Sequence, residues 1–176
     1  MDSIKDHLPA SIKTDRLVLT TPTAAHVPDI ARLANSISVN QTMARLPFPY
    51  AESDARFFVE TIVPSADELC YAVLIDGEEF AGIVGLTFQD AMPPHLGYWL
   101  GEPYWGRGYA TEAAAALVGA ARSAGLPALA SRALSENAGS RNVLRKCGFR
   151  ETGEIVETVN NLSGRQMVSM HLDLDR

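Results

Sequence analysis

A glycine-containing segment between a predicted strand and an alanine-rich predicted helix constrains the fold more than any other feature. It reads Glu102-Pro-Tyr-Trp-Gly-Arg-Gly-Tyr-Ala-Thr-Glu-Ala113. Gly106, Gly108 and Ala110 allow a ligand to approach the backbone closely, and the helix that follows begins with unpaired N–H groups. Such a loop is suited to bind an anion, normally a phosphate. A tight turn that needs only positive φ angles is the alternative interpretation of the same residues.

Two familiar phosphate-binding loops do not fit this segment. A P-loop that starts at Gly101 reaches Gly106, but Arg107 and Gly108 then stand where Lys and Ser or Thr are required. A dinucleotide-binding loop that starts at Gly106 has Thr111 where Gly or Ala is required, and the acidic residue expected about 20 positions later is missing. The segment therefore indicates a different kind of anion site.

The rest of the chain alternates between short apolar strands and amphipathic helices. Asp76-Gly77 is a strong hairpin signal, and the last two predicted strands are expected to pair antiparallel. We predict strands over 16–20, 70–75, 80–88, 95–100, 126–134, 149–156 and 166–172, and helices over 23–35, 53–63, 111–124 and 140–147. This order predicts an α+β fold: a mixed, mainly antiparallel sheet of about seven strands, with flanking helices and one helical crossover.

Length and composition are those of a single globular domain over residues 1–176, with its core over about 14–174. The net charge of −6 argues against a broad nucleic-acid-binding surface. Cys70 and Cys147 have neither the number for a disulfide framework nor the spacing for zinc, so we expect no metal. No apolar run approaches the roughly 20 residues of a membrane helix, and residues 1–10 do not resemble a secretory signal. We therefore expect a cytoplasmic protein with no membrane partner.

One segment is basic although the whole chain is acidic. Residues 132–150 contain five basic side chains and one acidic side chain. Arginine and lysine in such a cluster are suited to phosphate groups, and a solvated helix face is the alternative interpretation. The basic residues are Arg132, Arg141, Arg145, Lys146 and Arg150, and the acidic one is Glu136.

Two motifs together resemble the GNAT superfamily of acetyl-CoA-dependent N-acetyltransferases. They are Tyr104-Trp-Gly-Arg-Gly-Tyr-Ala-Thr-Glu-Ala113 and Asn137-x-x-Ser140-x-x-Val-Leu-x-Lys-x-Gly148-Phe149. Within that superfamily, Leu46-Pro-Phe-Pro-Tyr50 and Leu96-Gly-Tyr-Trp-Leu100 are similar to the subfamily that acetylates the N-termini of ribosomal proteins. The resemblance runs from Arg16 to about Leu172. The motifs are specific for the fold and for acetyl-CoA, and weak for the acceptor.

The resemblance implies where acetyl-CoA would bind. In the family two central strands splay apart, and the pantetheine arm lies in the gap against the strand that corresponds to 95–100. Backbone amides of the glycine loop hold the pyrophosphate at the helix N-terminus. The residues that match these positions are Tyr98, Trp99, Leu100, Gly106, Arg107, Gly108, Tyr109, Ala110, Thr111, Asn137, Arg141 and Lys146.

The resemblance also implies direct transfer of the acetyl group to a neutral primary amine. An α-amino group, with a pKa near 8, loses its proton more easily than lysine at about 10.4. Ser140 matches a serine proposed to protonate the leaving thiolate, whereas Leu144 stands where many members have a tyrosine. His95 stands where relatives often carry a glutamate proposed as base. The alternatives are a helix N-cap role for Ser140 and a structural role for His95.

Several further expectations follow. The acceptor is a protein N-terminus or a small-molecule amine, which we expect to enter between the 36–53 segment and the 157–165 loop. A non-catalytic acyl-CoA-binding protein on the same fold is the alternative function, and a homodimer is left open. The segment 121–125 approximates a hydrolase nucleophile elbow, but Ser123 ends a predicted helix, whereas an elbow serine follows a strand.

Overall fold

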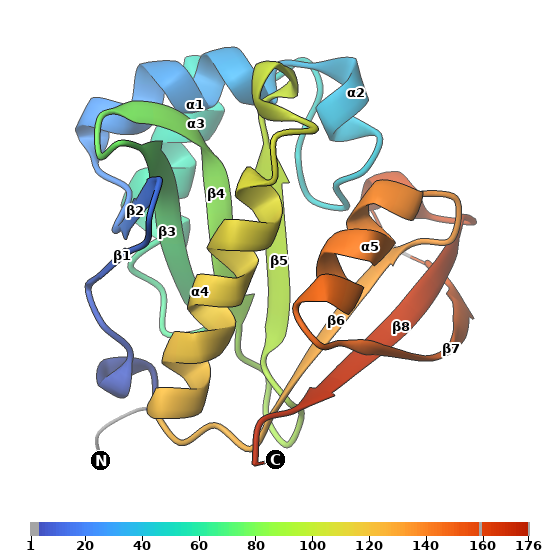
Figure 1. Cartoon of the computed structure of the whole chain (residues 1–176). Coiled ribbons are helices and arrows are strands. Elements are labelled where there is room, and N and C mark those ends of the chain that lie inside the picture. The colour runs from blue at the N-terminus through green and yellow to red at the C-terminus, as the bar shows by residue number, and fades with distance from the viewer. Residues whose placement is uncertain (1–3, 159, 176) are drawn as a thin grey trace.

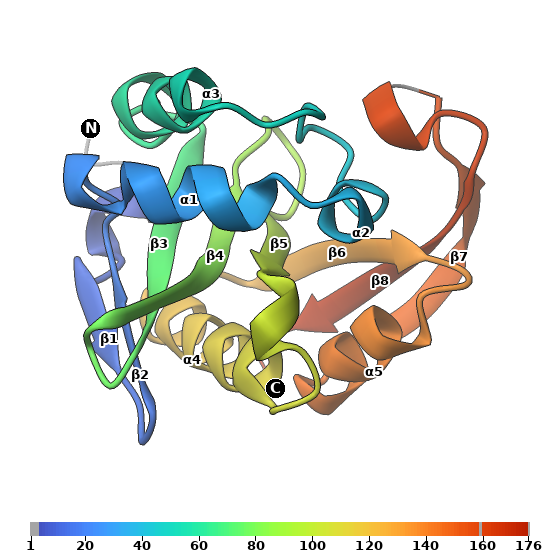
Figure 2. The ribbon, with the colours of Figure 1, turned by 90° about the horizontal axis from the view of Figure 1, so that it is seen from above.

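The computed structural model describes residues 4–158 and 160–175. One sheet lies between two layers of helices (Figures 1 and 2), with α1 and α3 on one face and α4 and α5 on the other. The strands are β1 Ser11–Lys13, β2 Leu17–Thr20, β3 Glu68–Ile75, β4 Glu79–Thr87, β5 His95–Leu100, β6 Ala128–Leu134, β7 Arg150–Val156 and β8 Gln166–Asp173. The helices are α1 Val27–Ala34, α2 Ile37–Asn40, α3 Glu52–Phe57, α4 Tyr109–Ser123 and α5 Ala138–Lys146.

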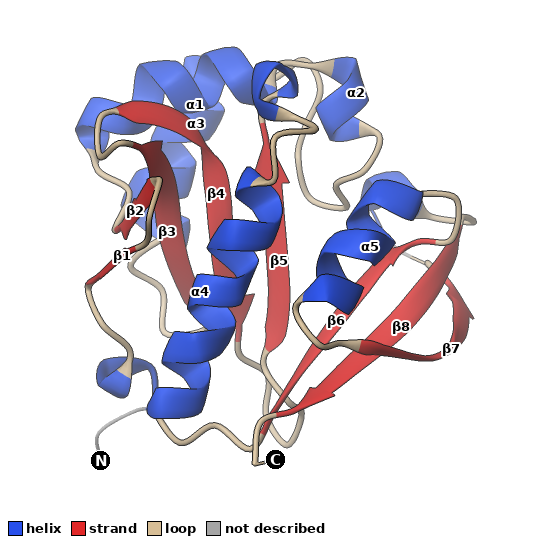
Figure 3. Cartoon of the chain, viewed as in Figure 1, coloured by secondary structure: helices blue, strands red, loops and turns tan. Residues whose placement is uncertain are grey.

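The sheet has the strand order β1-β2-β3-β4-β5-β6-β8-β7. Every neighbouring pair is antiparallel except β5 and β6, which are parallel. A parallel pair needs a crossover, and α4 supplies it on one face of the sheet (Figure 3). The predicted α+β class, mainly antiparallel sheet and single central crossover are therefore confirmed.

The β3–β4 turn has the geometry that its sequence predicts. Asp76 and Gly77 have φ angles of 52° and 78°. Two successive positive φ angles match the twist of the flanking strands, which favours Asp-Gly in hairpin turns. The register pairs Ile75 with Glu79, so Glu78 is a third residue of this turn. The predicted pairing of the last two segments is also confirmed, since β7 and β8 are antiparallel.

The main core lies between the sheet and both helical layers. Tyr71 and Leu117 are fully buried in it, one on central strand β3 and the other on α4. The small side chains Ala113, Ala114 and Ala121 are buried along the same helix, which lets α4 pack closely on the sheet. This packing fixes the direction in which the N-terminus of α4 points.

One short strand and one short α-helix were not predicted. β1 is three residues long at one edge of the sheet, too short to show an apolar alternation. α2 has four residues, and its N-cap Ser36 accepts a hydrogen bond from the Val39 N–H at 3.3 Å. Of the helices in the two described ranges, none has the length and apolar character needed to cross a bilayer.

Candidate active site

The loop between β5 and α4 has the backbone shape that its glycines predict. Gly106 and Gly108 have φ angles of 72° and 81°, and Gly108 is the N-cap of α4. A Cβ at Gly106 would meet no heavy atom within 4 Å, so the loop borders open space. The first intrahelical bond runs from the Glu112 N–H to the Gly108 carbonyl at 3.1 Å. The N–H groups of residues 109–111 therefore have no intrahelical acceptor and can bind an anion at the positive end of the helix dipole.

β5 and β6 separate immediately after they meet. Their register covers one position, at which His95 lies opposite Ala130. Next to that position, the buried Ser131 hydroxyl donates to the Leu96 carbonyl at 2.8 Å. The two strands then diverge toward the end of the sheet where α4 begins (Figure 1). This is the splay that the family resemblance implies.

The antiparallel pairing of β5 with β4 decides which β5 backbone groups face this gap. Gly101 donates its N–H to the Ala81 carbonyl at 2.9 Å. Because hydrogen-bonding direction alternates along an antiparallel strand, the backbone of Trp99 also points toward β4. The backbones of Tyr98 and Leu100 point toward the gap, although the Leu100 carbonyl already accepts the Trp105 indole N–H at 2.8 Å. A pantetheine amide could pair with the Tyr98 backbone and with the Leu100 N–H.

A side-chain hydrogen bond connects β5 to α5 across the gap. The Tyr98 hydroxyl donates to the Ser140 hydroxyl oxygen at 3.0 Å, and burial raises the pKa of Tyr98. The N-cap of α5 is Asn137, whose Oδ1 accepts the Ser140 N–H at 3.1 Å. The helix thus begins before Ser140, so the alternative that Ser140 caps it is wrong. The Ser140 hydroxyl is therefore not needed to cap α5.

His95 lies on the opposite face of β5 from Tyr98, because side chains alternate along a strand. Its Nε2 is buried and has no hydrogen-bond partner among the described residues. Burial lowers the pKa of His95 to about 4, and the positive charges of Arg132 and Arg45 act in the same direction. The imidazole is therefore neutral at pH 7, and its Nε2 can take part in a hydrogen bond. On the same face, a Cβ at Gly97 would lie in open space.

A row of polar side chains extends from His95 across three strands. The register places Thr87 of β4 opposite His95 and Glu68 of β3 opposite Thr87. The buried Glu68 carboxylate accepts the Thr87 hydroxyl at 3.0 Å and two N–H groups of Arg45 at 3.1 Å. Sequence reasoning missed Glu68 and Arg45. Glu68 comes just before a predicted apolar strand, and only the strand register brings it near His95.

Two predicted acetyl-CoA contacts lie elsewhere than expected. The Trp99 side chain is buried, with its ring 6.3 Å from that of Phe80, and its backbone faces β4, so we remove Trp99 from the candidate site. Arg141 donates to the Glu151 carboxylate at 2.9 Å and to the Ser135 carbonyl at 2.8 Å. Its guanidinium is thus already used in holding α5 to β7.

The basic segment is largely neutralised by acidic residues outside it. Arg132 pairs with buried Glu157 at 2.8 Å, and Arg150 pairs with Asp173 at 2.7 Å. Arg145 shares Glu151 with Arg141. The local charge count therefore overstated the anion site, because it could not include partners distant in sequence.

Lys146 is the exception in this segment. It is exposed and makes no ion pair in the part of the chain that the structure describes. The next residue, Cys147, places its Sγ 3.7 Å from the Thr111 carbonyl, so the end of α5 lies beside the first turn of α4. Lys146 is accordingly the basic side chain of this segment that is best placed to approach a phosphate.

The two segments expected to flank the acceptor are joined to each other. Asn161 donates its backbone N–H to the Ala44 carbonyl at 3.1 Å and its side-chain amide to the Met43 carbonyl at 3.2 Å. Arg165 donates to the Gln41 carbonyl at 2.6 Å and pairs with Glu136. Both segments lie on the side of the sheet that carries α1 (Figure 2). The route between them stays a prediction, and it now includes these contacts.

Other candidate chemistries find no support. Within 4–158 and 160–175, no three His, Cys, Asp or Glu side chains are grouped so as to hold a metal ion. Ser123 is the last residue of α4, as predicted, so it cannot act as a nucleophile on a strand-to-helix elbow. Burial raises the pKa of Cys70 to about 12 and that of Cys147 to about 11, so neither thiol is activated.

Comparisons with known proteins agree with this geometry. The sequence model of the acetyltransferase (GNAT) domain matches residues 16–150. The uncharacterized N-acetyltransferase YycN of Bacillus subtilis (strain 168) is 37% identical in an alignment over 81 residues that covers 42% of this chain and 52% of YycN. The match thus spans about half the length of that curated relative.

Solved acetyltransferase structures have the same fold. The microcin C7 self-immunity acetyltransferase MccE, in complex with acetyl-CoA and AMP, superposes with a TM-score of 0.83 at 22% identity, over 94% of this chain and 97% of that one. RimL, the ribosomal L7/L12 alpha-N-protein acetyltransferase in complex with coenzyme A, gives 0.83 at 19% identity, over 94% and 98%.

Proposed function

The chain belongs to the GNAT acetyltransferase family, and from this premise we propose that it transfers the acetyl group of acetyl-CoA to a primary amine. The observation that carries the proposal is the gap between β5 and β6. It has Tyr98 and Ser140 on one face, and His95 beside the open position at Gly97 on the other. A protein N-terminal α-amino group is the acceptor we favour, and a small-molecule amine is the second candidate.

The residues around the gap fit acetyl-CoA. Loop amides at residues 108–111 would hold the pyrophosphate, with Lys146 near a phosphate. The Tyr98 backbone and the Leu100 N–H would pair with the pantetheine arm. Asn137 still has its Nδ2 donor for that arm, because the N-cap bond uses only Oδ1. Acetyl-CoA supplies an activated thioester, so the chain needs chiefly to position the two substrates and to move protons.

Polar groups lie on both faces of β5. Neutral His95 would accept a hydrogen bond from the acceptor amine, directly or through a water molecule, and so orient it, while the ammonium proton leaves to solvent because its pKa lies well above the pKa of about 4 of His95. A backbone N–H of β5 that faces the gap would stabilise the oxyanion. The Tyr98 and Ser140 hydroxyls lie 3.0 Å apart, so Ser140 would give its proton to the departing thiolate while Tyr98 passes its own proton to the Ser140 oxygen and regains one from solvent. Tyr98 and Ser140 thus compensate for the leucine at position 144.

An N-terminal α-amino group is favoured on two grounds. It is neutral more often than a lysine amine at pH 7, by the difference in their ordinary pKa values. RimL, whose fold this chain shares, is named for alpha-N-protein acetylation. Small amines remain the second candidate, because the spermidine N-acetyltransferase from Vibrio cholerae, in complex with CoA and spermine, has the same fold, with a TM-score of 0.78 at 16% identity.

An acceptor panel tests the proposal. Release of free thiol from acetyl-CoA should be measured with peptides that begin with Ser, Ala and Met, with polyamines and with aminoglycosides. We expect turnover with at least one peptide, and none when its α-amino group is blocked beforehand. Mass spectrometry should locate the added acetyl group on the amine nitrogen.

The same panel tests the non-catalytic alternative. The proposal would be contradicted if the whole panel stayed silent although acetyl-CoA bound tightly. The chain would then be an acyl-CoA-binding protein. Turnover with polyamines alone would retain the reaction and overturn the N-terminal acceptor.

A further inference from the structure

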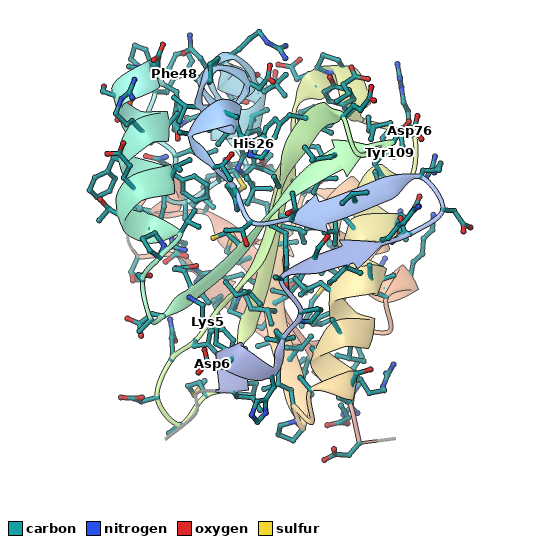
Figure 4. All side chains as sticks on the ribbon, turned by 90° about the vertical axis from the view of Figure 1, so that its left-hand side faces the viewer. Lys5, Asp6, His26, Phe48, Asp76 and Tyr109 are labelled. Carbon is teal, nitrogen blue, oxygen red and sulfur yellow. The ribbon has the colours of Figure 1, made fainter. Side chains whose placement is uncertain are left out.

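One side chain outside the reactive centre connects the start of β2 to the glycine loop. Arg16 donates from Nε to the Glu112 carboxylate at 2.7 Å and from Nη1 to the Arg107 carbonyl at 2.9 Å. Its guanidinium carbon also lies 4.5 Å from the ring centroid of Tyr109. Figure 4 labels Tyr109 on the side of the molecule where the β1 and β2 strands lie. Arg16 therefore contacts the loop, its N-cap region and the first turn of α4 together.

Glu112 is the second half of this connection. One of its carboxylate oxygens accepts the Thr14 hydroxyl at 2.7 Å and the Arg16 backbone N–H at 2.9 Å. The other accepts the Arg16 side chain. Burial alone would raise the pKa of Glu112, but the hydrogen bonds from Thr14 and Arg16 outweigh it and lower the pKa. Glu112 is thus ionised at neutral pH, and its first-turn position also suits the helix dipole.

The glycine loop needs support of this kind. Gly106 and Gly108 flank Arg107, both have left-handed φ angles, and residues 105–108 are all exposed. Such a loop contributes little packing of its own, and glycine leaves its backbone many other conformations in solution. A Cβ on Gly108 would lie 3.3 Å from Arg16 Nη2. The Arg16 guanidinium therefore packs directly against the N-cap residue of α4.

An anion is bound well only when the amides already point to one place, because ordering them on binding costs affinity. We propose that Arg16 is a positioning residue for acetyl-CoA: through the Arg107 carbonyl and Glu112 it holds the glycine loop in the shape that presents its amides to the pyrophosphate. Arg16 Nε and Nη1 are both engaged with the protein, so Arg16 acts through the loop. This inference rests on one part of the proposed function, namely that the glycine loop binds acetyl-CoA.

The test compares two ligands that differ in the pyrophosphate. Dissociation constants for acetyl-CoA and for S-acetylpantetheine, which lacks the pyrophosphate and the nucleotide, should be measured by calorimetry. In the wild-type protein acetyl-CoA should bind much more tightly. In Arg16→Ala its dissociation constant should rise about tenfold, the size expected for one charged hydrogen bond, while that of S-acetylpantetheine stays within about twofold. A general loss of stability would weaken both.

Two further variants sharpen the comparison. Arg122→Ala is the matched control: Arg122 lies at the other end of α4, and its Nε donates to the Leu174 carbonyl at 3.3 Å. It should leave the ratio of the two dissociation constants unchanged. Arg16→Lys keeps the charge but loses the fork that reaches both Arg107 and Glu112, so it should behave like Arg16→Ala.

Each outcome decides the inference. An unchanged ratio in Arg16→Ala overturns it and leaves the proposed function in place. A wild-type ratio in Arg16→Lys also overturns it, since charge alone would then suffice. Failure of the wild-type protein to bind acetyl-CoA overturns the proposed function, and this inference with it.

Discussion

His95 on β5 and Ser140 on α5 lie near opposite faces of the same strand and have different surroundings. His95 is buried without a hydrogen-bond partner among the described residues, whereas Ser140 meets Tyr98 on the other face of the sheet. The sequence alone placed both residues near the reaction by resemblance. Their environments could not be predicted, because they depend on side chains from β3, the 36–53 segment and α5 that come together only in the fold.

The depressed pKa of His95 predicts a pH dependence of stability. Its pKa falls from 6.5 to about 4 in the folded chain, so below pH 6.5 the unfolded chain binds a proton that the folded chain does not. Stability is therefore present above pH 6.5 and is lost as pH falls toward 4. Between pH 7 and pH 5, denaturant unfolding should show the wild-type protein losing about 2 kcal/mol more than His95→Gln. Equal losses in the two proteins would contradict the buried, neutral imidazole.

Ser140 gives a second prediction, on turnover. Ser140→Ala should lower kcat by about tenfold or more, since general acid catalysis contributes about 10²–10⁴-fold, while the acetyl-CoA dissociation constant changes little. The melting temperature should stay within about 2 °C, because Asn137 caps the helix. A loss of stability in step with activity would show that Ser140 is structural after all.

Tyr98 extends this prediction to a pair. Tyr98→Phe removes the donor to Ser140 and should also lower kcat. If the two hydroxyls work together, the double variant should be no worse than Ser140→Ala alone. Additive losses in kcat would mean that Tyr98 acts independently of Ser140.

At the scale of elements, the N-terminus of α4 borders the proposed acetyl-CoA site, whereas its C-terminus leads into a turn to which we assign no ligand. Gly108 and Gly125 stand at its two ends with φ angles of 81° and 83°. Alanine at either position should cost about 1–2 kcal/mol of stability, because a Cβ is strained in the left-handed region. Acetyl-CoA affinity, measured by calorimetry, should fall only in Gly108→Ala, by about tenfold, since the new Cβ also presses on Arg16. Equal affinity in the two variants would remove the loop from the cofactor site.

Most elements were predictable from local patterns. The β5 segment was predicted at its observed bounds, and α4 begins two residues earlier than predicted, at Tyr109. Gly108 is the N-cap of α4. The pattern of apolar residues, from which the start of the helix was predicted, does not reveal a cap of this kind. The mistaken start of α5 has a similar cause: Ser140 and Asn137 are both good N-caps, and the choice between them depends on which one reaches the free N–H groups.

The charge of the basic segment was harder to predict than its structure. The resemblance predicts Arg141 as an acetyl-CoA contact, but Arg141 and Arg145 of the basic cluster both hydrogen-bond to Glu151 on β7. The strand register that brings Glu151 beside α5 is a long-range property. Conversely, Arg16 and Glu112 were each visible in the sequence, but nothing local indicated that they would meet.

For the whole molecule, bound acetyl-CoA should stabilise the fold, because it would contact both β5 and α5 across the place where β5 and β6 share only one register pair. A ligand present at about 100 times its dissociation constant adds roughly 2.7 kcal/mol to the stability of the folded state. For a domain of 176 residues, this corresponds to a rise of several degrees in the unfolding midpoint. NADH and ATP serve as controls and should produce smaller shifts. A larger shift with ATP than with acetyl-CoA would contradict a pantetheine site in the gap.

Where β5 and β6 diverge beyond their one register pair, the proposed site has Tyr98 and Ser140 on one face of the sheet and His95 on the other. In the proposed function acetyl-CoA approaches from the side of α4 and α5, and the amine from the side of α1. Neither substrate has to leave before the other can arrive, so both are present when the acetyl group moves. Initial rates measured at several fixed acetyl-CoA concentrations should therefore give intersecting double-reciprocal lines, and each product can depart by its own route.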